Sequence, residues 1–187
     1  MGMAQARIAR LTETDWRAFA GVRLRALTDS LGAEDPQYRH ESTFTAAQWR
    51  RRLRAHAQFA AVVDNRPVGL IGAQRQSSES VYLYSLWLDP TARGRGLGRT
   101  LVAEAVDWAR SQRVQWVTLR VHAANRAARA IYDGLGFTVS ATDTAKTAGE
   151  ITMMLNVSRC RDGSDPSANA AGPSPAPHGP YRPPGSP

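Results

Sequence analysis

The sequence predicts one α/β domain in which seven strands and four helices share a core. Three features lead to this fold class. Residues 6–157 alternate between strand-like and helix-like spacing of apolar side chains. A loop rich in glycine and arginine joins an apolar strand directly to an apolar helix at residues 89–99. The chain of 187 residues is long enough for one domain with a full core and too short for two.

The expected elements follow the order strand, helix, helix, three strands, helix, strand, helix and two strands. Strands are expected at residues 6–11, 59–63, 68–73, 81–88, 115–121, 137–141 and 151–157. Helices are expected at residues 16–31, 49–57 and 97–109, and directly after Asn125. The polar stretch 32–42, which contains Pro36, is expected to form a loop.

Local signals support several of these elements. Thr45 and Gln48 have the spacing of a capping box, and Phe44 is placed to pack on Trp49. The residues Asp-Asn-Arg-Pro at 64–67 lie between two apolar runs and predict a hairpin turn. The second helix carries four arginines, which indicate a solvent-facing surface or, alternatively, a wall that faces substrate or phosphate. They are Arg50, Arg51, Arg52 and Arg54.

The segment from residue 86 to residue 99 has the composition of a phosphate-binding loop. Its glycines are Gly94, Gly96 and Gly98, and its arginines are Arg93, Arg95 and Arg99. Glycine lets the backbone approach a bulky ligand, and the first turn of a helix offers unpaired N–H donors at the positive end of its dipole. Guanidinium groups add charge that suits phosphate. We therefore expect a pyrophosphate to bind here.

Two common phosphate-binding motifs do not match this segment. A dinucleotide fingerprint that begins at Gly94 needs a glycine at position 99, where Arg99 stands. A P-loop needs a lysine after its last glycine, and the only lysine in the chain is Lys146. The pattern Arg-x-x-Gly-x-Gly at residues 93–98 instead resembles the acetyl-CoA-binding signature of the GNAT superfamily of N-acetyltransferases.

A second motif lies one helix and one strand further along the chain. Residues 119–137 contain a strand end, Asn125, a short helix with Tyr132, and a closing Gly-Phe pair. This order is similar to that of the same superfamily. Asn125 and Tyr132 are seven residues apart, so both point to one side of the helix. The resemblance covers residues 6–157 in organisation, and its most specific part is residues 81–137.

The resemblance implies a mixed, mostly antiparallel seven-stranded sheet flanked by four helices. It also implies that the parallel central strands, 81–88 and 115–121, splay apart at their carboxyl ends. Unpaired backbone groups there can bind the pantetheine arm of the cofactor as an extra strand. The implied reaction is direct transfer of an acetyl group from acetyl-CoA to a primary amine of a small molecule or peptide in a ternary complex, with no metal.

The resemblance also implies roles for individual residues. The cofactor-binding residues would be Leu86, Leu88, Arg93, Gly94, Arg95, Gly96, Gly98, Arg99, Thr100, Asn125 and Arg129. Among them, the backbone N–H of Leu88 would stabilise the oxyanion that forms from the thioester carbonyl. Tyr132 is the candidate general acid, because a phenol with an ordinary pKa of ~10 keeps its proton at neutral pH.

The sequence defines the general base less well, because residues 81–88 contain no carboxylate. His122, which ends a strand near the expected splay and belongs to the residue type most often used as a general base, is the candidate catalytic base. The alternatives are Glu79, Glu150, and a chain of waters with Tyr84 and Ser85 as relays.

The walls of the acceptor pocket are expected in two loops, at residues 32–44 and 142–150. Loops of this kind vary within a fold, so the sequence does not define the acceptor. Four acidic side chains in or near the first loop could attract a cationic amine. They are Asp29, Glu34, Asp35 and Glu41.

Composition narrows the other possibilities. We attribute the net charge of +8 to a GC-rich coding bias that favours arginine and to an anionic cofactor. Nucleic-acid binding is less favoured, because it needs basic residues on one face or interleaved with aromatics. A single cysteine, Cys160, cannot form an internal disulfide, and no apolar run is long enough to span a membrane. We expect a cytoplasmic protein, and a homodimer remains open.

The chain is expected to divide into a catalytic domain at residues 1–158 and a tail at residues 159–187. Proline, glycine and serine dominate the tail, which is expected to be disordered because it has too few large apolar residues to offset its chain entropy. The alternative to an enzyme is a catalytically silent domain of the same fold that binds acetyl-CoA or docks a protein partner.

Overall fold

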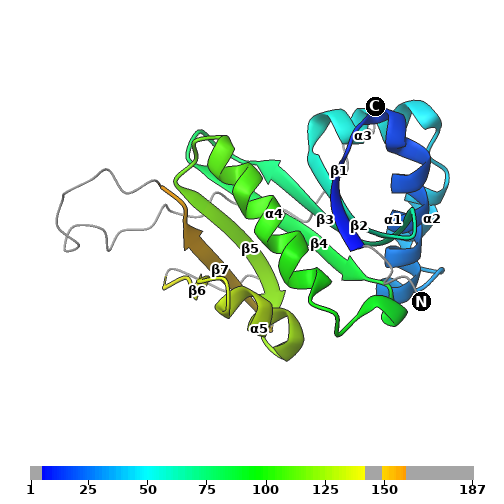
Figure 1. Cartoon of the computed structure of the whole chain (residues 1–187). Coiled ribbons are helices and arrows are strands. Elements are labelled where there is room, and N and C mark those ends of the chain that lie inside the picture. The colour runs from blue at the N-terminus through cyan, green and yellow to red at the C-terminus, as the bar shows by residue number, and fades with distance from the viewer. Residues whose placement is uncertain (1–5, 142–148, 159–187) are drawn as a thin grey trace.

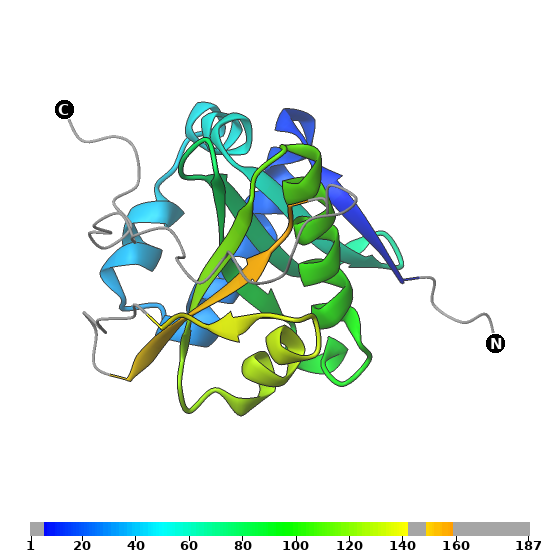
Figure 2. The same ribbon diagram turned by 90° about the vertical axis from the view of Figure 1, so that its left-hand side faces the viewer.

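The computed structural model describes residues 6–141 and 149–158, which form one seven-stranded sheet with helices on both faces (Figure 1, Figure 2). The strands are β1 (Ala6–Leu11), β2 (Ala57–Val63), β3 (Arg66–Arg75), β4 (Ser80–Leu88), β5 (Trp116–His122), β6 (Thr138–Val139) and β7 (Glu150–Asn156). The helices are α1 (Trp16–Leu31), α2 (Pro36–Ser42), α3 (Ala46–Ala55), α4 (Leu97–Ser111) and α5 (Arg126–Asp133).

The strands lie in the order β1-β2-β3-β4-β5-β7-β6. Every neighbouring pair is antiparallel except β4 and β5, which are parallel. This topology confirms the expected mixed, mostly antiparallel α/β fold with a parallel central pair.

Helix α4 covers one face of the sheet, whereas α1 and α3 lie on the other with α2 beside them (Figure 1). Five of the six residues in the apolar stripe predicted for α4 are buried, as helical spacing requires: Leu97, Leu101, Val102, Ala105 and Ala109. The sixth, Trp108, is partly buried against the same core. In β2, Phe59 packs in the core under α4, and the next residue, Ala60, packs in the core under α1 and α3. The sheet therefore separates two apolar cores.

The local signals act as expected. In the hairpin between β2 and β3, Asp64 and Asn65 have φ of +49° and +61°, as a two-residue turn of the type I′ class requires. At the start of α3, Thr45 N–H donates to the Gln48 side chain at 2.7 Å, which closes the predicted capping box.

The central strands separate at their carboxyl ends. Parallel pairing joins only residues 80–83 of β4 to residues 116–119 of β5. On the other edge of β4, Leu70 of β3 pairs with Trp87 and Gly72 pairs with Tyr84, so β4 has one extra residue at this point. Ser85, at φ +56°, lies within this β-bulge. The bulge bends β4 away from β5, and the predicted splay is confirmed.

The prediction of a loop at residues 32–42 is wrong, because residues 36–42 form α2, so that the described residues contain five α-helices rather than four. The Asp35 side chain accepts from Gln37 N–H at 2.8 Å, and Pro36 occupies the first helical position, where it needs no hydrogen-bond donor. Tertiary contacts of Glu41, described below, hold this short polar helix in place.

Two predicted boundaries also shift. The second helix ends before Ala57, because His56 is already extended and Ala57 begins β2. The strand predicted at 137–141 is reduced to two residues. Phe137 N–H donates to the Tyr132 carbonyl at 3.0 Å, which keeps Phe137 in the turn after α5 and directs its side chain into the core.

Among the described residues, no helix has the length and apolar character needed to cross a membrane. Most of the predicted pocket wall at 142–150, namely residues 142–148, lies outside the described residues. The predicted disordered tail, residues 159–187, also lies outside them.

Candidate active site

The loop between β4 and α4 forms an open backbone cradle. Gly94 and Gly96 have φ of +75° and +77°, a conformation that costs other residues energy. A Cβ built on either glycine would have no neighbour within 4 Å. Gly96 is the N-cap of α4, and no side chain in the described part of the chain caps this helix. The first N–H groups of α4 are therefore available to a ligand.

Cationic side chains surround this cradle. Arg95 and Arg99 are exposed, and the Arg99 guanidinium extends to Gly134, where a Cβ would lie 2.7 Å from Nη1. Thr100 Oγ1 donates to the Gly96 carbonyl at 3.2 Å. Unpaired N–H donors, two exposed guanidinium groups and room for close approach together fit the diphosphate of coenzyme A.

Two residues predicted to bind the cofactor also make structural contacts. The Arg93 guanidinium donates to Asp29 at 2.7 Å and to the Leu88 carbonyl at 3.0 Å, which fastens the cradle to α1 and β4. Gly98 is buried, and a Cβ there would lie 3.0 Å from Cδ1 of Ile131. The close contact that Gly98 permits brings α5 against the first turn of α4.

Helix α5 carries the candidate general acid. Asn125 caps the helix, since its side chain accepts from Ala128 N–H at 3.1 Å. Arg129 donates to the Ala123 carbonyl at 3.3 Å. Tyr132 is only 6% exposed and packs on Phe137 at a centroid distance of 5.7 Å. Burial raises the pKa of Tyr132 to about 12, so its hydroxyl is protonated at neutral pH.

Of the three side chains considered as bases, the structure pairs His122 with Glu150 across β5 and β7 and leaves Glu79 at the opposite end of the parallel pair. Glu79 precedes the amino end of β4, whereas the strands separate at the carboxyl end. Glu150 pairs with Arg120 at 3.4 Å. His122 is exposed at the end of β5, where Nδ1 accepts from Ala124 N–H at 3.3 Å and the ring lies against Gly149. These contacts give His122 a role in the turn that follows β5.

A cavity of about 300 Å³ lies on the α1 side of β4, beside the splay. Its lining residues come from α1, α2, β3 and β4. They are Arg23, Ala26, Leu27, Ser30, Leu31, Gln37, Gln74, Tyr82, Tyr84, Ser85, Leu86 and Trp87. Because Leu86 belongs both to this lining and to the unpaired part of β4, the cavity adjoins the expected pantetheine path.

The four acidic residues expected to attract an amine are already partnered. Asp29 pairs with Arg93 and accepts from Trp87 Nε1 at 2.8 Å. Asp35 caps α2, and Glu34 pairs with Arg39. Glu41 is 0% exposed and bound to arginines. No carboxylate appears among the residues that line the cavity in the described part of the chain.

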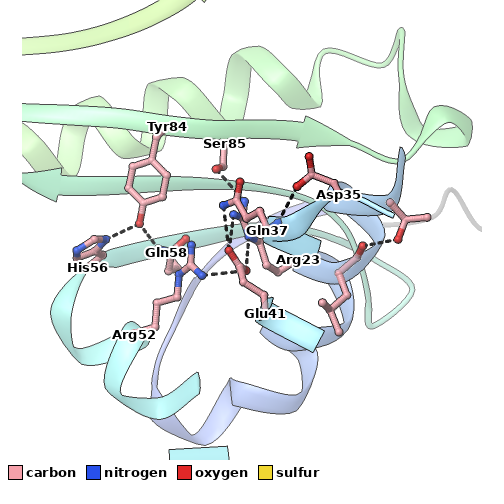
Figure 3. Close-up of polar contacts among 11 residues, drawn as sticks. Arg23, Asp35, Gln37, Glu41, Arg52, His56, Gln58, Tyr84 and Ser85 are labelled. Carbon is pink, nitrogen blue, oxygen red and sulfur yellow. Dashed lines mark hydrogen bonds and ion pairs between the residues drawn. The ribbon is translucent and has the colours of Figure 1, made fainter. Parts of the chain in front are cut away.

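Glu41 is the centre of a buried ion cluster (Figure 3). Its two carboxylate oxygens accept from Nε and Nη2 of Arg23, each at 2.9 Å. Arg52 Nη1 lies 2.9 Å from the same carboxylate, and Gln37 donates to it at 3.1 Å. Although burial opposes ionisation, hydrogen bonds from Arg23 and the charge of Arg52 lower the pKa of Glu41 to about 2. The expectation that Arg52 faces solvent or phosphate is therefore wrong.

The cluster extends to the cavity and to β4. Arg23 Nη1 donates to Ser85 Oγ at 2.9 Å, at the β4 bulge. The Tyr84 oxygen lies 2.6 Å from His56 Nδ1 and 2.7 Å from Gln58 Nε2 (Figure 3). Two sets of polar side chains thus reach the β4 wall of the cavity: the Glu41 cluster at Ser85, and the pair of His56 and Gln58 at Tyr84.

A sequence model described as the Acetyltransferase (GNAT) family matches residues 24–137, more than half of the chain. The match spans the cradle, the splayed strands and α5. The chain belongs to the GNAT acetyltransferase family.

Relatives of this chain in the GNAT family are named for different acceptors. The mycothiol acetyltransferase of Beutenbergia cavernae is 48% identical over 56 residues, which cover 30% of this chain and 19% of that protein. The [ribosomal protein bS18]-alanine N-acetyltransferase of Salmonella typhimurium is 33% identical over 97 residues, which cover 52% of this chain and 62% of that protein. The chain thus matches about a fifth of the length of the first relative.

Solved GNAT structures share the fold. The PaiA N-acetyltransferase of Thermoplasma acidophilum, crystallised with coenzyme A, has a TM-score of 0.64 at 18% identity and covers 81% of this chain and 99% of its own. The ribosomal-protein-S18-alanine N-acetyltransferase of Escherichia coli has a TM-score of 0.61 at 22% identity, covering 86% of this chain and 99% of its own.

Sequence reasoning missed three residues of this GNAT site, which lie outside both motifs: Arg23, His56 and Gln58. It named Glu41, but as an attractor of the amine rather than as the centre of a buried ion cluster. The signal that could have found α2, and with it the position of Glu41, is the pair Asp35-Pro36, a favourable N-cap followed by a favourable first helical residue. No local pattern marks His56 or Gln58, because their partner Tyr84 is 28 and 26 residues away.

Proposed function

We propose that this protein transfers an acetyl group from acetyl-CoA to a primary amine of a small molecule or peptide, by direct attack in a ternary complex. The observation that carries this proposal is the position of the open cradle at the carboxyl end of β4, where β4 leaves β5 and a cavity adjoins it. A thioester carrier held in the cradle and an amine held in the cavity could then meet at the splay.

The cradle would hold the diphosphate. Gly94 and Gly96 let the backbone approach it, the N–H groups of the first turn of α4 donate to it, and Arg95 and Arg99 supply charge. Thr100 and Gly98 shape the same turn, and Arg93 fixes the loop. Bound acetyl-CoA supplies the activated acetyl thioester.

The unpaired part of β4 would align the cofactor arm. Backbone groups of Leu86 and the N–H of Leu88 lie beyond the last β4–β5 pair and would be offered to the pantetheine arm, whereas the Leu88 carbonyl accepts from Arg93. The N–H of Leu88 would donate to the thioester oxygen as negative charge develops there. On the other side, Asn125 and Arg129 would line the path along α5.

Tyr132 would act as the general acid. Its hydroxyl is protonated at neutral pH and would supply a proton to the thiolate as coenzyme A departs. The close approach of Ile131 to Gly98 supports this role, because it brings α5, the helix that carries Tyr132, against the first turn of α4.

The acceptor would enter the cavity as an amine on a small or partly apolar body. Apolar side chains of Leu27, Leu86 and Trp87 line the cavity together with hydroxyl and amide groups. Because a relative is named for acetylating an alanine of a ribosomal protein, a peptide with amino-terminal alanine belongs among the acceptors to test.

Thermal unfolding with acetyl-CoA, coenzyme A and NAD tests the cofactor, since a ligand that binds only the folded state raises the midpoint. We expect both coenzyme A compounds to raise it and NAD to leave it unchanged. Thiol release with a panel of small primary amines and the alanine peptide tests the transfer. Binding without thiol release for any amine would identify the silent acetyl-CoA-binding domain instead.

A further inference from the structure

Tyr84 connects the cavity to two side chains beside it. Its phenol lines the cavity, and its oxygen contacts His56 Nδ1 and Gln58 Nε2 (Figure 3). His56 is half-buried between α3 and β2, whereas Gln58 is 1% exposed. One end of this group therefore meets the acceptor site, and the other end, His56, reaches water.

The donors and acceptors around the Tyr84 oxygen are consistent with a phenol proton that points toward His56. The Gln58 amide nitrogen can only donate, so the Tyr84 oxygen accepts from it. In the Nε2–H tautomer of a neutral His56 ring, Nδ1 carries no proton and accepts the hydrogen bond that the Tyr84 phenol donates. Partial burial and the positive charge of Arg52 lower the pKa of His56, which favours this neutral form.

Resting on the acetyltransferase function proposed above, we infer that Tyr84 and His56 form the relay that removes a proton from the attacking amine. An N–H bond of the ammonium breaks, and its proton passes to the Tyr84 oxygen directly or through one water. The Tyr84 O–H bond breaks in the same step, and that proton bonds to His56 Nδ1. The imidazolium then releases one proton to water. The net result is one free amine and one proton in solvent.

The charges around the relay favour proton release. Arg52 of α3 faces His56 and destabilises its protonated ring. Glu41 of α2 pairs with Arg52 and with Arg23 of α1, so the cluster of two arginines and one carboxylate keeps a net positive charge. A proton that reaches His56 is therefore not trapped there.

In this arrangement the base relay and the general acid use different phenols, Tyr84 and Tyr132. Tyr82 stacks on Tyr84, with ring centroids 6.4 Å apart and planes at 11°. Tyr82 is also close enough to Tyr132 to contribute to its raised pKa, after burial. Tyr84 and Tyr132 thus lie near a common neighbour, Tyr82. Tyr84 takes up the proton that the amine loses, and Tyr132 supplies a different proton to the departing thiolate.

The first test compares His56→Asn with His40→Gln in the full chain. Asparagine can accept a hydrogen bond from Tyr84 but cannot be protonated, whereas His40 lies exposed on α2 and contacts Phe44. With acetyl-CoA and the fastest amine of the panel, we expect His56→Asn to lower kcat about 10²-fold and to keep the thermal shift by acetyl-CoA. His40→Gln should keep wild-type kcat. A wild-type kcat for His56→Asn at every pH overturns the relay.

A second measurement needs no acceptor. In ¹⁵N NMR spectra of the unliganded protein, we expect the Nε2–H tautomer for His56 and a pKa that rises in Tyr84→Phe, because the lost hydrogen bond stabilises the neutral ring. An Nδ1–H tautomer, or the same pKa in both proteins, overturns the relay. If the wild-type protein acetylates no amine, the proposed function is overturned. The NMR spectra still test the hydrogen bond between Tyr84 and His56 in that case.

Discussion

The aromatic ring of Tyr84 lies directly over the backbone of Gly72. A Cβ built on Gly72 would come within 2.4 Å of Tyr84 Cζ and within 2.6 and 2.8 Å of two further ring carbons. The two residues pair across β3 and β4, next to the bulge at Ser85. Glycine at position 72 is therefore what lets the phenol lie along the sheet and reach His56.

We expect Gly72→Ala to displace the Tyr84 ring, with a loss of about 1–3 kcal/mol in the free energy of unfolding and a marked fall in kcat. Urea unfolding and thiol release measure the two effects. Gly21→Ala is the control, because Gly21 is exposed on α1 with nothing within 4 Å of its added Cβ. That change should leave kcat unaltered and stabilise the helix slightly. Equal kcat in both variants would contradict the role of Gly72.

Glu41→Gln should strongly destabilise the fold. The change leaves Arg23 and Arg52 buried without their carboxylate, which costs about 3–5 kcal/mol. The matched control is Glu34→Gln, which breaks an exposed ion pair with Arg39 and should cost less than about 1 kcal/mol. Denaturant unfolding of both proteins gives the comparison, and similar losses for the two would argue against a structural role for the cluster.

The same carboxylate predicts how stability depends on pH. The pKa of Glu41 is lowered in the folded state from 4.5 to about 2, so its contribution is fully present above pH 4.5 and is lost as pH falls toward 2. The linked free energy is about 3 kcal/mol. The difference in unfolding free energy between wild type and Glu41→Gln should shrink over this interval, and a constant difference would refute the assignment.

Tyr132→Phe should slow turnover about 10²-fold without weakening acetyl-CoA binding. The phenol is buried in the core, and loss of one hydroxyl leaves the packing on Phe137 in place. The pKa of Tyr132 is raised to about 12, so the hydroxyl stays protonated as pH rises toward that value. We therefore expect no loss of wild-type kcat from deprotonation of Tyr132 over this range. Thiol-release rates and thermal shifts separate the two effects, and an unchanged kcat would exclude Tyr132 as the acid.

Gly96→Ala tests the cradle. Its φ of +77° makes a side chain cost about 1–3 kcal/mol, and a Cβ would enter the space offered to phosphate. Gly32→Ala is the control for strain, because Gly32 ends α1 outside the cradle loop and its φ of +89° and ψ of 159° strain a side chain at least as much. Both variants should lose stability, but only Gly96→Ala should lose affinity for acetyl-CoA in calorimetric titration. Equal affinities would place the diphosphate elsewhere.

The elements that the sequence determined by itself are those with short-range causes. The stripe of α4, the capping box at Thr45 and the turn at Asp64 and Asn65 each depend on residues within one or two turns of the chain. The cradle belongs to the same class in part, since its glycines and the apolar helix after them could be read locally, whereas the contact of Arg93 with Asp29 that fastens the loop comes from a distant segment. These features could be predicted because hydrogen bonding and backbone conformation are local.

Helix α2 and the acceptor cavity required the tertiary structure. Seven mostly polar residues form a helix too short to be stable alone, and long-range contacts of Glu41 with Arg23 and Arg52 hold it. The bulge at Ser85 and the register of β4 then decide that Tyr84 meets His56 rather than solvent. Strand register and ion pairing act between residues far apart in the chain, so no local pattern in the sequence could specify which side chains would share the cavity.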